Sequence, residues 1–132
     1  IGDDAISANR KRGSYHVYDL GEIWYQQTGL PMIFAVMAYR NEMETEQGAL
    51  LSYVGRSMIE SKERCQRENF VPVIERVIEE HGGTFQFWNS YFNGLNYQFS
   101  GEHEKGLNLY FQLAVECGLL NTMPSIIKYS YK

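Results

Sequence analysis

Hydrophobic positions follow different periods before and after about residue 40. Before it, two runs favour β structure: the short run from Tyr15 to Tyr18 and the continuous apolar run from Met32 to Tyr39. A run without polar positions is typical of a strand that is covered on both faces, as in parallel or mixed sheets. We therefore expect a small mixed sheet in the first part of the chain.

A helix between these two runs is predicted from the residues at its ends. Asp19 is a suitable N-cap residue, and Glu22 follows three positions later, as in a variant of the capping box. Gly29 suits the left-handed position after a helix, and Pro31 cannot continue one. The helix should therefore begin after Asp19 and end near Gly29.

Helical spacing of apolar residues predominates after residue 40. Four helices are expected there, over residues 44–67, 70–80, 85–95 and 102–117. So small a sheet could not cover this much helix. The pattern therefore indicates that partner strands belong to a segment outside this sequence.

Composition and charge exclude several classes of protein. The 132 residues suit one domain, and an apolar fraction of 44% with a charged fraction of 21% is typical of a soluble globular protein. No apolar run is long enough to span a membrane. The net charge of −4, with basic residues clustered only at Arg10-Lys11-Arg12, argues against a nucleic-acid surface.

Few residues suggest metal or nucleophile chemistry. Cys65 and Cys117 form no Cys-x-x-Cys pair, so a reduced, cytoplasmic protein is the simplest interpretation. His16, His81 and His103 are isolated from one another in the sequence, and we expect no metal site. The sequence also has no Gly-x-Ser-x-Gly, P-loop or Gly-x-Gly-x-x-Gly motif.

The strongest candidate for chemistry is the stretch Ile1-Gly2-Asp3-Asp4. It reads as a strand end followed by the start of a helix, where an open α/β sheet binds its ligands. Free N–H groups there could hold an anion, and a carboxylate could hold a hydroxyl or move a proton. The alternative is that Asp3 only caps its helix. The residues alone do not separate these two interpretations.

Three stretches together resemble one enzyme family: IGDDAI, YDLGEIWYQQTGLPMIFAVMAYR and LNLYFQLAVECGLL. They are similar to the C-terminal half of the menaquinone-biosynthesis enzymes of the futalosine route, which include chorismate dehydratase and 1,4-dihydroxy-6-naphthoate synthase. Both branches share the pattern at Asp19–Trp24 and Thr28–Pro31. The Ile-Gly-Asp start and the run FAVMAYR resemble the dehydratase branch, because the synthase has a His-Glu pair at the start and Gly-rich sequence after Leu-Pro.

The resemblance implies an α/β fold like that of type II periplasmic binding proteins, with two lobes and the ligand between them. This chain would be an incomplete portion of it, with a small mixed sheet followed by several helices. Residues 1–30 would be the remainder of the second lobe, residues 31–120 the hinge strand and helical part of the first lobe, and residues 121–132 a tail. An N-terminal half of the same protein would be its partner.

The resemblance also implies a reaction, the loss of water from chorismate to give 3-[(1-carboxyvinyl)oxy]benzoate, without a cofactor. Asp3 would be the catalytic residue, holding or protonating the departing hydroxyl. Gly2 and, more weakly, Asp4 would bind the substrate. The alternatives are the naphthoate synthase, a non-catalytic small-molecule binder on the same scaffold, and a helical interaction domain over residues 44–118.

Overall fold

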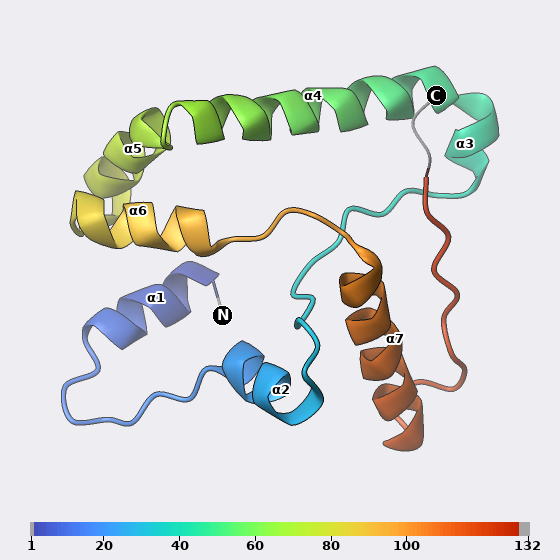
Figure 1. Cartoon of the computed structure of the whole chain (residues 1–132), viewed down its shortest axis with the longest axis horizontal. Coiled ribbons are helices and arrows are strands. Elements are labelled where there is room, and N and C mark those ends of the chain that lie inside the picture. Colours follow the sequence, from blue (N-terminus) through green and yellow to red (C-terminus); the bar gives the residue numbers. More distant parts are fainter. Residues whose placement is uncertain (1, 130–132) are drawn as a thin grey trace. The chain divides into compact units, whose positions relative to one another are not determined.

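The computed structural model describes residues 2–129, with Asp3 described by its backbone alone, and the regular secondary structure of this part of the chain is entirely α-helical (Figure 1). The helices are α1 (Gly2–Arg10), α2 (Leu20–Thr28), α3 (Glu42–Glu46), α4 (Gly48–Arg67), α5 (Val71–His81), α6 (Phe85–Gly94) and α7 (Gly101–Glu116). No strand occurs among the described residues. The predicted α/β fold with a small mixed sheet, like that of periplasmic binding proteins, is therefore wrong for this structure.

Both predicted strands are extended coil instead. Residues 15–18 and 32–39 have no regular secondary structure, and their large side chains face solvent: Tyr15 is 81% exposed, Phe34 69% and Met37 76%. A β-favouring sequence shows that side chains would suit a pleated surface, but a strand also needs a neighbour to complete its hydrogen-bond ladder. The residues described here supply no such neighbour, so the preference of these runs is not realised.

The chain divides into two compact units. The first unit combines residues up to Val36 with Phe99–Ile126, and so contains α1, α2 and α7. The second unit combines Met37–Gln98 with the residues from Ile127 onward, and so contains α3, α4, α5 and α6.

In the first unit, α2 has the ends that its sequence predicts. The backbone N–H of Glu22 donates to Asp19 Oδ1 at 3.0 Å, which caps the helix start. At the other end, Gly29 has a left-handed φ of 69°, and its N–H donates to the carbonyl of Tyr25 at 2.8 Å. These contacts confirm the predicted helix and both of its boundaries.

The first unit also contains a close approach between α7 and the turn after α2. Gly106 of α7 is buried against the backbone of Pro31, and a Cβ at position 106 would overlap the Pro31 carbonyl oxygen. Beside this contact Trp24 and Tyr110 pack edge to face, with ring centroids 6.1 Å apart. The indole Nε1 of Trp24 is buried and has no hydrogen-bond partner among the described residues.

The second unit is a chain of helices in sequential contact: α3 touches α4, α4 touches α5, and α5 touches α6. Figure 1 shows that the chain turns at α5, so that α6 points back along the direction of α4. The single helix expected over residues 44–67 is instead two helices, because the backbone of Gln47, with φ −139°, leaves the helical conformation between α3 and α4.

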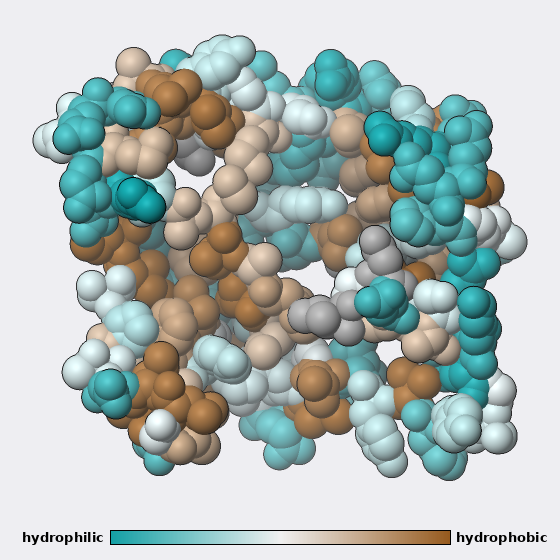
Figure 2. Space-filling view, turned by 180° about the vertical axis from the view of Figure 1, so that it is seen from behind, coloured by the Kyte–Doolittle hydropathy of each residue, from teal (hydrophilic) through white to brown (hydrophobic). Residues whose placement is uncertain are grey.

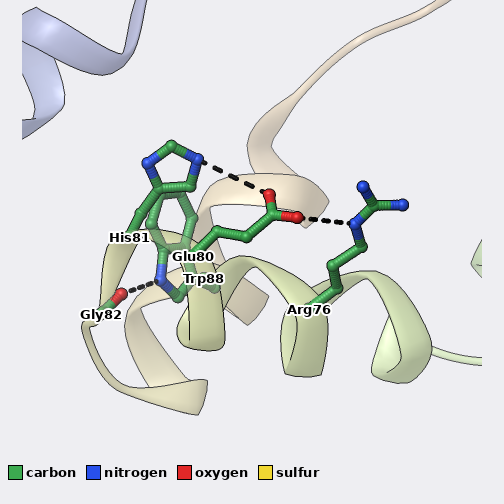
Figure 3. Close-up of polar contacts among 5 residues, drawn as sticks. All are labelled: Arg76, Glu80, His81, Gly82 and Trp88. Carbon is green, nitrogen blue, oxygen red and sulfur yellow. Dashed lines mark hydrogen bonds and ion pairs between the residues drawn. The ribbon is translucent and has the colours of Figure 1, made fainter.

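The core of the second unit lies between α5 and α6. Ile74 is fully buried, Trp88 is 4% exposed, and Phe70 stacks on Phe92 with ring centroids 5.6 Å apart. The indole Nε1 of Trp88 donates to the carbonyl of Gly82 at 2.8 Å, as Figure 3 shows. This bond ties the start of α6 to the end of α5 and satisfies the one polar atom of a buried aromatic side chain.

Much apolar surface stays exposed in both units. On α4 the apolar stripe that the sequence predicts is uncovered, since Leu50, Val54 and Met58 each remain more than 40% exposed. Figure 2 shows hydrophobic residues spread over the face that it presents. Exposed apolar surface on this scale is typical of segments that pack against another part of a protein or a partner.

Candidate functional site

The predicted site residues lie at the start of α1. The helix begins at Gly2, whose φ is +65°, and Asp3 lies within the helix and not ahead of it. The short helix expected here is therefore present. The strand end predicted at Ile1 and the side chain of Asp3 lie outside the described residues.

The start of α1 is open to solvent. Gly2 and Asp4 are exposed, and a Cβ built on Gly2 meets no atom within 4 Å. Within the described part of the chain, the backbone of α1 approaches no other helix. Sequence adjacency places Gly2, Asp3 and Asp4 together on one turn, and the N–H groups of a helix start can receive an anion. Among the described residues, no other helix brings a group beside this turn.

A hollow in the second unit is a feature that sequence reasoning missed. It is lined by Ala38, Tyr39, Arg40, Glu42, Met43, Glu46 and Gln47. The Tyr39 hydroxyl donates to Glu44 Oε2 at 3.3 Å, and its ring lies edge-on to Tyr129. Burial, followed by the nearby Glu44 carboxylate, raises the pKa of the Tyr39 hydroxyl. No motif marks these residues, because the hollow forms only where the coil meets α3.

The charges of the hollow do not favour an anion. Arg40 supplies one guanidinium, whereas Glu42 and Glu46 supply two carboxylates on the same short helix. A substrate with two carboxylates would meet repulsion as well as attraction here. The hollow alone therefore does not account for dianion binding.

A polar cluster at the end of α5 is a further group of titratable side chains (Figure 3). Arg76 Nε donates to Glu80 Oε1 at 2.9 Å, and His81 Nε2 lies 3.9 Å from Glu80 Oε2. The hydrogen bond from Arg76 lowers the pKa of the Glu80 carboxyl below its ordinary value. Glu80 and His81 are about half exposed, so this is a surface ion pair and not an enclosed catalytic site.

Groups that could hold a metal ion are not formed by the described residues: no three His, Cys, Asp or Glu side chains come together there. Cys65, half-buried on α4, and Cys117, exposed at the end of α7, are free thiols. Over the same part of the chain, no helix is both long and apolar enough to cross a membrane.

Comparison with known families decides the affiliation of the chain. Residues 1–116 match the family model described as menaquinone biosynthesis. The chain belongs to the menaquinone-biosynthesis family. The match runs from the start of α1 to the end of α7, and so includes the two stretches IGDDAI and YDLGEIWYQQTGLPMIFAVMAYR in full. The resemblance inferred from these stretches is confirmed at the level of the family.

The family match supports an enzyme of menaquinone biosynthesis but does not separate its branches. No solved structure matches the chain. The choice between dehydratase and naphthoate synthase therefore depends on the residues that differ between the two.

Proposed function

We propose that the chain is part of a chorismate dehydratase, which converts chorismate to 3-[(1-carboxyvinyl)oxy]benzoate for menaquinone biosynthesis. The observation that carries the proposal is the family match over residues 1–116. Within that family, the Ile1-Gly2-Asp3 start and the FAVMAYR run at 34–40 resemble the dehydratase branch and not the naphthoate synthase.

The reaction needs modest help from the protein. Loss of the ring hydroxyl and a ring proton makes the ring aromatic, which is strongly downhill. The enzyme has to hold a dianion, assist removal of the proton and stabilise the departing hydroxide. In this proposal the backbone N–H of Gly2 receives a substrate carboxylate, Asp3 protonates or holds the leaving hydroxyl, and Asp4 is a secondary binding group.

The rest of the site would come from an N-terminal half of the same protein. Two observations support this partner: Gly2 and Asp4 at the start of α1 are exposed, and residues 34–38 form a continuous exposed apolar run. The hollow of the second unit offers more carboxylates than guanidinium groups, so it does not supply a dianion site in its place.

The test is turnover by this chain combined with the half that would precede it. Incubation with chorismate should give an aromatic product, detected by its absorbance and mass. Asp3→Asn should abolish that product while circular dichroism stays unchanged, and Asp4→Asn, the matched control one residue on, should reduce turnover much less. If Asp3→Asn keeps the unsubstituted rate, Asp3 has no catalytic role.

Two other outcomes would replace the proposal. Conversion of cyclic futalosine in place of chorismate would assign the naphthoate synthase. Binding of chorismate without any product, measured by calorimetry, would assign a non-catalytic binder on the same sequence family.

A further inference from the structure

The uncovered apolar stripe on α4 consists of Leu50, Val54 and Met58. These residues are four positions apart, so they lie along one side of the helix, and each is more than 40% exposed. Ser52 lies two positions from both Leu50 and Val54, on the opposite side of the helix, and is 7% exposed. The stripe therefore faces away from the side of α4 that the second unit buries.

Neighbouring helices contact α4 only at its two ends. Among the described residues, α4 meets α3 before it and α5 after it, and no other helix. Figure 1 shows both neighbours turning away from the axis of α4. A helix of 20 residues, about 30 Å long, gains most of its stability from packing of its apolar side. A further surface packed on the stripe would therefore stabilise α4.

The charges near the two ends of α4 have opposite signs. The short helix α3, directly before it, carries three carboxylates and no basic side chain: Glu42, Glu44 and Glu46. The last two turns of α4 carry three basic side chains and one carboxylate: Lys62, Arg64, Arg67 and Glu63. Within the described part of the chain, none of these side chains takes part in an ion pair. Unpaired charges of opposite sign therefore lie beyond the two ends of the stripe.

This arrangement is self-complementary. In an antiparallel pair of α4 helices, the acidic end of each copy lies beside the basic end of the other, whereas a parallel pair brings like charges together. A two-fold axis at Val54 places Leu50 of each copy opposite Met58 of the other. The same register brings Glu46 of one copy toward Lys62 of the second.

We propose that the stripe on α4 is a docking surface for a second copy of this chain, in an antiparallel pair centred on Val54. The stripes of the two copies supply the apolar contact, and the charged ends determine its direction. One helix pair lies at or below the lower end of the roughly 1,200–2,000 Å² that stable interfaces bury, so the dimer should be reversible and dependent on concentration. The pairing is independent of the proposed reaction.

Cysteine cross-linking of the full chain tests the position of the axis. The natural thiols, Cys65 and Cys117, are first replaced by serine. Val54→Cys then places a thiol on the two-fold axis and should give a disulfide-linked dimer under mild oxidation. Arg56→Cys is the matched control, because position 56 is exposed on the opposite side of α4, and it should cross-link at least tenfold more slowly.

Two further measurements test the register and the direction. Leu50→Cys and Met58→Cys should each cross-link slowly alone and rapidly when the two variants are mixed. In sedimentation experiments, Glu46→Lys or Lys62→Glu alone should raise the Kd of the dimer about tenfold, because the two-fold axis doubles each contact. The two substitutions combined should restore the original Kd.

Three results would overturn the proposal. Equal cross-linking of Val54→Cys and Arg56→Cys would mean that the copies meet only by random collision. Rapid cross-linking of Leu50→Cys alone would mean that the helices pair in parallel. Loss of the Val54→Cys dimer on addition of the half that would precede this chain would assign the stripe to that half.

Discussion

The two units of this protein are stabilised in different ways. The second unit buries Phe70, Ile74 and Trp88 between consecutive helices, so its core forms from residues that are close in sequence. Among the described residues of the first unit, only the small residues Gly106 and Ala114 are buried, and the unit depends on helix caps and on one close backbone approach. The second unit therefore has a small hydrophobic core of its own. The first unit has the features of a segment that is stabilised by packing against further residues.

The largest effect should come from the core of the second unit. Ile74→Ala leaves a cavity at a fully buried position and should lower the free energy of unfolding of this unit by about 2–5 kcal/mol. The two tryptophans allow the units to be followed separately, since Trp24 lies in the first and Trp88 in the second. Ile74→Ala is combined with Trp24→Phe, which leaves the fluorescence of Trp88, and separately with Trp88→Phe, which leaves that of Trp24. Urea unfolding should show the loss of stability in the Trp88 signal alone. An equal shift of both signals would show that the two units unfold together.

In the first unit, Gly106→Ala should have the next largest effect. The new methyl group would overlap the Pro31 carbonyl oxygen, which is backbone and cannot turn aside, so the variant should lose about 1–3 kcal/mol. Gly101→Ala is the matched control on the same helix, because a Cβ at position 101 meets nothing within 4 Å. Trp24 fluorescence in urea measures both. Equal stability of the two variants would mean that α7 does not need this close approach.

The first unit also shows what its sequence could predict. Asp19 and Gly29 determine the ends of α2 through contacts within a few residues, and such local contacts are visible in the sequence. The run from Met32 to Tyr39 was misassigned because a strand depends on a partner, which no local pattern supplies. The break at Gln47 has no proline or strong capping signal to mark it, so α3 and α4 were predicted as one helix.

In the candidate site, too, local features were predictable from the sequence and long-range contacts were not. A short helix near Gly2 was predictable from its residues, although it begins ahead of Asp3 and not after it, whereas the hollow beside Tyr39 depends on where a coil meets a short helix. Tyr129 approaches Ser52 from 77 positions along the chain, and no spacing rule connects two such residues. Sequence reasoning therefore located the family and the ends of α2, but not the break between α3 and α4 or the long-range contacts of the second unit.

The cap of α2 gives a smaller test of the first unit. Asp19→Ala removes the acceptor for the Glu22 N–H and should cost about 0.5–2 kcal/mol, measured by the Trp24 signal in urea. Asp19→Asn keeps an oxygen in the same place and should retain most of the stability. If the asparagine variant is as unstable as the alanine variant, the charge of Asp19 matters and not its hydrogen bond.

The smallest effect is expected for the ion pair on α5. Arg76 lowers the pKa of Glu80, so the pair stabilises the folded state above the ordinary carboxyl pKa of 4.5 and loses that contribution as the pH falls below it. The Arg76 side chain is 77% exposed and that of Glu80 is 49% exposed. The stability of the Glu80→Gln variant should therefore differ only slightly from that of the unsubstituted chain at neutral pH. That difference should shrink as the pH falls below 4.5 and in 1 M salt, as measured by the urea midpoint of the Trp88 signal. Glu79→Gln is the matched control, because it removes one negative charge from the same helix and leaves the Arg76–Glu80 pair in place. A Glu80→Gln effect that persists at low pH and high salt would mean that Glu80 stabilises α5 by packing and not by its charge.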